Sequence, residues 1–130
     1  GCYSRGGKSS SLSPRIAIID RTRTRKSSRT ILNLAEVVED LQSHFGLNHE
    51  IPVFYFERTS FEDQVKILSG IDILITGHGA QETGIIFMPD CGSVLEIFPD
   101  HYYYPRFFGT LAASAGLQHS FLNLATNTSE

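Results

Sequence analysis

A glycine-rich loop is the part of the sequence whose residue types best suit ligand binding. Gly77 and Gly79 flank His78, and the run from Thr76 to Ala80 separates an apolar segment from a short helical one. Glycines let the backbone approach a ligand closely, and the helix start that follows offers N–H groups and partial positive charge to an anion. The loop predicts a diphosphate site, although a tight turn without any ligand explains the same spacing.

The basic stretch Arg21–Arg29 is a second candidate. Arg21 directly follows an apolar run and Arg29 precedes a helix start, so regular structure can hold both near the rim of the glycine loop. Fixed arginines bind phosphate in a bidentate manner. The basic residues between them, Arg23, Arg25 and Lys26, are more typical of a diffuse positive field. A solvated surface loop remains the alternative for the whole stretch.

Two titratable side chains lie close to these loops in the expected fold. His78 could act as a general base, donate a hydrogen bond to phosphate or tie the glycine loop down. Glu96 lies within the apolar run Val94–Phe98, where a carboxylate must be either paired or exposed at the strand end. A ribose hydroxyl would suit Glu96, and an ion pair with one of the arginines explains its position equally well.

Apolar runs of strand length alternate with segments of helical spacing along the chain. Strands are predicted over Arg15–Asp20, Ile51–Phe56, Ile71–Thr76 and Ser93–Phe98, with a weak one near His119–Leu122, and helices over 34–45, 61–69, 81–87 and 103–115. This alternation predicts an α/β fold, a doubly wound and mostly parallel sheet with helices on both faces. Both candidate loops follow strands, which is where such sheets bind ligands.

The helix ends carry recognisable signals. Asn33 and Glu36 fit a capping box for the first helix, and Gly46 supplies its end. Ser60, with Asp63 three residues later, predicts the start of the second helix.

Length and charge limit the class of protein. With 130 residues and 41% hydrophobic content, the chain suits one domain, predicted over 15–125 after a Gly/Ser-rich flexible lead-in over 1–14. The net charge is −3, yet the first 29 residues hold eight of the 11 Lys and Arg residues and one of the 14 acids. Most of the surface should repel phosphate, so no nucleic acid is expected as a partner, and the basic region predicts a local anion site.

Cysteine usage and apolar runs add little about location. Cys2 and Cys91 are a poor basis for a disulfide framework or a zinc site, which need clustered cysteines or ligands. Cys91 is expected to be a free, buried or half-buried small side chain. The sequence begins with Gly rather than Met and contains no apolar run long enough for a membrane-spanning helix, so localisation stays open.

Four blocks of residues occur in an order and spacing that fit one enzyme family. They are Arg21 with 29–36, 60–64, 77–81 with 87–89, and 94–99. Together they resemble the carboxyl-terminal half of the family 61 glycosyltransferases, over about Arg15 to Leu122. That family includes plant xylosyl- and arabinosyltransferases and animal secretory-pathway O-linked N-acetylglucosaminyltransferases.

The resemblance implies a GT-B enzyme with two Rossmann-like domains, of which this chain is the one that binds the nucleotide sugar. It implies inverting transfer from a UDP-linked donor to a glycan or protein hydroxyl, without a metal or other cofactor. The sequence has no Asp-x-Asp metal motif, so arginines and helix amides would meet the charge of the leaving diphosphate. It also implies a missing N-terminal acceptor-binding domain, an inactive isolated chain and, for a eukaryotic parent, a membrane-anchored enzyme of the Golgi or ER lumen.

The donor-binding residues are carried over by position. They would be Arg21, Arg29, Asn33, Gly77, His78, Gly79, Ala80, Gln81, Thr83 and Glu96. The arginines would contact or support the donor phosphates, Asn33 would cap the first helix, the glycine loop would cradle the diphosphate, and Glu96 would face the ribose or its rim. The catalytic base is not assigned, and His78 is the candidate for it.

The loop departs from the family pattern at 81–84, where the family usually has a small or apolar residue followed by Thr-Asn. Glu82 brings an acid beside the expected diphosphate, which is unfavourable unless its side chain points away, and Gly84 stands where an Asn is usual. A non-catalytic nucleotide- or anion-binding module is therefore an alternative. An interaction domain whose basic loop docks an acidic partner is another.

Overall fold

The computed structural model describes residues 14–21, 31, 33–47, 49–77, 80–98 and 105–123, with the backbone alone for 80–83, 105–107 and 123. The order of elements is β1 (Ile16–Asp20), α2 (Leu34–Phe45), β2 (Val53–Tyr55), α3 (Phe61–Leu68), β3 (Ile73–Gly77), the 3-10 helix η2 (Ala80–Phe87), β4 (Ser93–Phe98), α4 (Pro105–Ser114) and β5 (Gln118–Asn123). Within these ranges no helix is both long and apolar enough to cross a bilayer.

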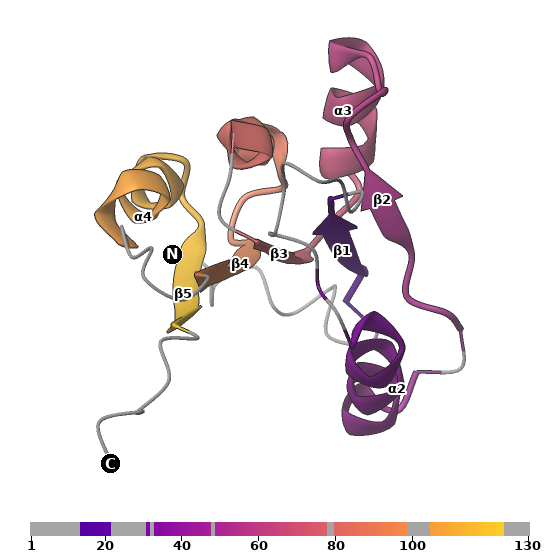
Figure 1. Ribbon diagram of the computed structural model, residues 1–130. Helices are drawn as coiled ribbons and strands as arrows, with labels where there is room; N and C mark the ends of the chain where they lie inside the picture. The colour runs from indigo at the N-terminus through magenta and orange to yellow at the C-terminus, as the bar shows by residue number, and fades with distance from the viewer. Residues whose placement is uncertain are drawn as a thin grey trace.

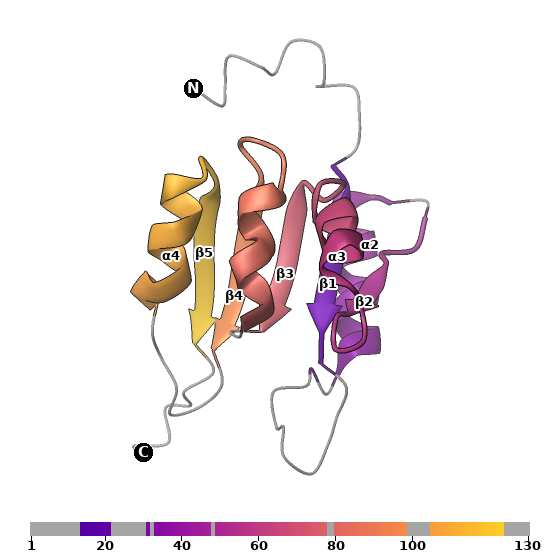
Figure 2. The same cartoon turned by 90° about the horizontal axis from the view of Figure 1, so that it is seen from above.

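The strands form one parallel sheet in the order β2-β1-β3-β4-β5. In Figure 2 the strand arrows point toward the same edge of the sheet. The chain runs outward from β1 to β2 and then returns to β3 on the other side of β1, so the strand order reverses between β1 and β3. The predicted doubly wound α/β fold is confirmed, and this reversal point is where such sheets open a crevice for ligands.

Helices cover both faces of the sheet. Figure 1 shows α2 on one face and α3 and α4 on the other. On the α2 face, Ile18 and Ile75 pack with apolar residues of α2, and on the opposite face Ile19 and Leu74 pack with residues of α3, η2 and α4. All five residues of β1 are buried, which explains why its sequence is continuously apolar up to Asp20.

Two of the three predicted helix-end signals are confirmed. The Ser60 side chain accepts a hydrogen bond from the Asp63 backbone N at 3.2 Å, and Gly46 ends α2 with a left-handed φ of 61°. The predicted capping box at Asn33 does not form, so this prediction is wrong. Asn33 precedes α2 with φ −106° and ψ 43° and makes no side-chain cap hydrogen bond, because an N-cap side chain reaches the first turn from an extended backbone.

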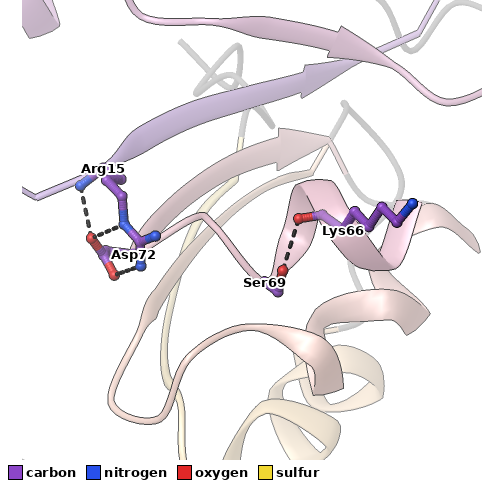
Figure 3. Close-up of polar contacts among 4 residues, drawn as sticks. All are labelled: Arg15, Lys66, Ser69 and Asp72. Carbon is purple, nitrogen blue, oxygen red and sulfur yellow. Dashed lines mark hydrogen bonds and ion pairs between the residues drawn. The ribbon is translucent and has the colours of Figure 1, made fainter. Parts of the chain in front are cut away.

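Arg15 and Asp72 join the starts of β1 and β3 at the amino edge of the sheet (Figure 3). Arg15 donates from Nε to Oδ2 and from a terminal guanidinium nitrogen to Oδ1, both at 3.0 Å, and from its backbone N to Oδ2 at 2.9 Å. The hydrogen bonds from the guanidinium hold the pKa of Asp72 below its usual value, against the effect of partial burial. The pair lies at the edge of the sheet opposite the candidate loops.

The prediction that Cys91 is a free thiol is wrong. The residue is half-buried as expected, in the turn before β4, but it is disulfide-bonded. Its φ is 67°, and its backbone N donates to the Gly116 carbonyl at 3.1 Å. The chain has one other cysteine, Cys2, which lies outside the described residues. A single disulfide needs two positions that the fold brings together, and local cysteine spacing does not detect them.

Candidate functional site

The candidate site lies where β1 and β3 end, side by side, at the carboxyl edge of the sheet. Register pairs Ile19 of β1 with Thr76 of β3, so Arg21 and Gly77 leave the sheet from neighbouring strands. The sequence predicted that both loops share one rim, and the strand order places both loop starts there. In Figure 2 the arrowheads of β1 and β3 mark this edge.

Asp20 ties the two ends of the basic stretch together. Its carboxylate is 4% exposed, and Oδ1 accepts from the backbone N of Arg21 at 2.8 Å and of Ile31 at 3.0 Å. One buried acceptor thus fixes the exit from β1 and the approach to α2. Asp20 was not among the predicted site residues. The signal that could have found it is an acid at the last position of a buried strand, directly before the loop.

Of the predicted basic residues of the loop, the structure describes Arg21. Arg21 is half-buried directly after β1, as predicted. Arg29 and the three mid-loop cations lie outside the described residues. Asn33 is exposed at the start of α2 and does not cap the helix.

The glycine loop is described at its two ends. Gly77 is the half-buried last residue of β3, and the Thr76 hydroxyl donates to the Gly77 carbonyl at 3.2 Å. η2 starts at Ala80, so a helical segment follows the loop as predicted. His78 and Gly79 lie outside the described residues, as do the side chains of Ala80, Gln81, Glu82 and Thr83.

Gly84 has a packing role. A Cβ at this position would lie 2.5 Å from Cδ1 of Leu68, a distance that real side chains do not tolerate. Glycine therefore lets η2 lie against α3. A side chain at position 84 would require Leu68 to shift.

Glu96 is fully buried on β4, and His119 on β5 is one of its partners. Oε1 of Glu96 lies 2.8 Å from Nε2 of His119. Of the two possibilities for a carboxylate within an apolar run, pairing is the one observed. The sequence analysis missed His119, because the two residues are 23 positions apart and meet only through the pairing of β4 with β5.

A second hollow lies at the opposite edge of the sheet. A cavity of about 250 Å³ lies at the amino edge, with Pro14, Pro52 and Phe54 among its lining residues. Its cation, Arg15, is already engaged with Asp72. Within the described ranges, no group of three or more His, Cys, Asp or Glu side chains is arranged to hold a metal ion.

Comparisons with known proteins find related sequences. The family model Glycosyltransferase 61 matches residues 3–95. Protein O-linked-mannose beta-1,4-N-acetylglucosaminyltransferase 2 of Tetraodon nigroviridis is 32% identical over 104 residues, which are 77% of this chain and 17% of that protein. The mouse protein of the same name is also 32% identical over 104 residues, 76% of this chain and 17% of its own length.

A second kind of relative matches a shorter segment. EGF domain-specific O-linked N-acetylglucosamine transferase of Canis lupus familiaris is 36% identical over 70 residues, 54% of this chain and 13% of that protein. The chain thus spans about 17% of the length of the first relatives it matches. Because the family model covers most of the chain, this protein belongs to the glycosyltransferase 61 family.

Proposed function

We propose that this chain forms the donor-binding part of a glycosyltransferase that transfers a sugar from a UDP-linked donor to a glycan or protein hydroxyl. One observation carries the proposal: in a family 61 chain, the Arg21 and Gly77 loops start from neighbouring strands at the reversal point of the sheet. Ligands bind at such points. The names of the relatives, which specify O-linked mannose and EGF domains, support a protein-linked acceptor.

The proposed reaction needs charge stabilisation at the leaving group. The acceptor oxygen forms a bond to the anomeric carbon as the bond to the diphosphate oxygen breaks, with inversion, and a base takes the acceptor proton. Arg21, Arg29 and the amides after Gly77 would stabilise the leaving diphosphate without a metal. An acceptor-binding domain outside this chain would supply the base, and the isolated chain would transfer nothing. Within the glycine loop, His78 would donate a hydrogen bond to phosphate.

The other predicted donor residues take supporting roles in this proposal. Gly79, Ala80, Gln81 and Thr83 would complete the diphosphate cradle. Asn33 would lie beside the basic loop without capping α2. Because Glu96 is fully buried, it would act from beneath the glycine loop and not through direct contact with a ribose on the surface.

Calorimetry of the 130-residue chain with UDP tests donor binding. We expect weak binding, near millimolar, that is stronger for UDP than for UMP, because the second phosphate adds charge-assisted hydrogen bonds. EDTA should leave the affinity unchanged. An absence of heat at millimolar UDP would refute the proposed site. A thermal-shift scan of nucleotide sugars would then identify the donor by selective stabilisation.

One assay distinguishes a transferase from a non-catalytic anion-binding module. The full-length protein should release UDP from its donor only when an acceptor hydroxyl is present, and NMR of the product should show an inverted anomeric centre. Nucleotide binding without transfer to any acceptor would favour the module.

We also propose that the protein works in the ER or Golgi lumen. The disulfide at Cys91 supports this location, because disulfides persist in oxidising compartments and are rare in the cytosol. Expression of the full-length gene with a fluorescent tag would test it. Cytosolic fluorescence together with a reduced Cys91 would contradict it.

A further inference from the structure

A buried polar pair lies beneath the candidate site. Glu96 lies two residues from both Val94 and Phe98 along β4, so its side chain is on their face of the sheet, which η2 and α4 cover. Glu96 is 0% exposed, and the side chain of its partner His119 is 12% exposed. A carboxylate removed from water requires a hydrogen-bonding or charged partner, so His119 compensates part of the cost of burying Glu96.

The surrounding structure fixes the orientation of the imidazole. Gly109 of α4 faces the ring, since a Cβ there would lie 3.2 Å from Nδ1 of His119. The ring of Phe121 lies on another side, with centroids 6.4 Å apart. Nε2 therefore points at Glu96, and the two side chains share a hydrogen bond of 2.8 Å.

Glu96 is connected to the glycine loop through β3. Register pairs it with Thr76, and register partners direct their side chains to the same face of the sheet. Thr76 is also fully buried, and its hydroxyl donates to the carbonyl of Gly77, where the loop begins. A buried polar row thus runs from His119 through Glu96 and Thr76 to the first residue of the loop.

We infer that His119 is a positioning residue that acts through Glu96 to hold the end of β3 from which the donor-phosphate loop starts. The inference rests on the proposed function, because it takes the loop to be the phosphate site. It assigns a role in donor binding to a residue on the last described strand, away from the two loops.

Substitutions at His119 test the inference in the full-length protein. His119→Gln keeps an N–H donor near the position of Nε2, whereas His119→Leu keeps similar bulk without a donor. We expect His119→Leu to raise the Kd for UDP by at least about tenfold and His119→Gln by no more than about threefold, because a hydrogen bond to a buried carboxylate is lost only in the first. Asp72→Asn, which weakens the pair at the opposite edge of the sheet, should leave the Kd unchanged.

Hydrogen exchange without nucleotide provides a second readout. His119→Leu should speed amide exchange over residues 76–80, and His119→Gln should restore the wild-type rate. If UDP does not bind the wild-type protein but these amides respond, the positioning role stands and the donor proposal fails. If UDP binds and a folded His119→Leu protein matches the wild type in both measurements, the positioning role is refuted.

Gly109→Ala provides the test if His119→Leu does not fold. Its Cβ would press on the imidazole without removing the donor, so we expect a severalfold higher Kd and faster exchange at 76–80. Wild-type values for both in Gly109→Ala would overturn the inference.

Discussion

Arg21 leaves β1 at the point where the strand order reverses, and Asp20 fixes its backbone there. We expect Arg21→Ala in the full-length protein to weaken UDP binding by ~1.5–3 kcal/mol, the usual cost of losing a charge-assisted contact. Arg29→Ala should behave similarly. Lys66→Ala is the matched control, because it removes one positive charge from an exposed i,i+4 pair with Glu62 on α3. Equal dissociation constants for the Arg21 and Arg29 variants and the wild type would remove both arginines from the site.

At the residue scale, the sequence predicted those site residues whose place depends only on where a strand ends. Arg21 and Gly77 follow apolar runs, and parallel strands place their ends at one edge. Asp20 and His119 were missed because their partners, Ile31 and Glu96, are distant in sequence and meet them only in the folded chain. No local pattern of residue types records such contacts.

At the scale of elements, close packing of η2 on α3 depends on Gly84. We expect Gly84→Ala to lower the free energy of unfolding by ~1–3 kcal/mol, because the new Cβ would overlap Cδ1 of Leu68. Urea unfolding measures the loss. Leu68→Ala in the same chain should make the Gly84→Ala substitution nearly neutral, since the overlapping methyl is gone. Additive effects of the two changes would show that the contact does not limit residue 84.

The pair of Arg15 with Asp72 links β1 to β3, and its contribution to stability should depend on pH. The folded-state pKa of Asp72 is lowered, so its contribution is present above the unfolded-state pKa of about 4 and is lost as pH falls through the folded value. We expect Asp72→Asn to cost up to about 1 kcal/mol at pH 7, because both side chains are partly exposed, and less near pH 3. Glu62→Gln, in an exposed helix pair, should show no comparable difference. A cost that is constant from pH 3 to 7 would contradict this.

The strands differ in how clearly the sequence marks them. β4 matches its prediction to the residue, because Val94–Phe98 is apolar apart from Glu96. β5 gave only a weak signal, because it is an edge strand and carries exposed Gln118 and Ser120. An edge strand buries less of its surface, so its polar residues obscure the apolar pattern.

At the scale of the whole molecule, the sequence predicted a parallel doubly wound sheet but not its strand order. Alternation of strands and helices sets the class of fold, whereas the order β2-β1-β3-β4-β5 depends on how the faces of α2 and α3 pack. That order makes β1 and β3 neighbours and so brings the starts of the basic and glycine loops together. This adjacency gives the uneven charge distribution a place in the fold, because the cation-rich loop starts beside the loop that we propose to bind phosphate.

The disulfide at Cys91 should contribute to the stability of the whole chain. We expect reduction, or Cys91→Ser, to lower the free energy of unfolding by ~2–4 kcal/mol, because a cross-link restricts the unfolded chain. Urea unfolding with and without a reductant measures the loss. Reductant should have no effect on the Cys91→Ser variant, which serves as the control. If the unreduced, denatured wild-type chain exposes two reactive thiols, there is no cross-link, and the proposed luminal location loses its structural support.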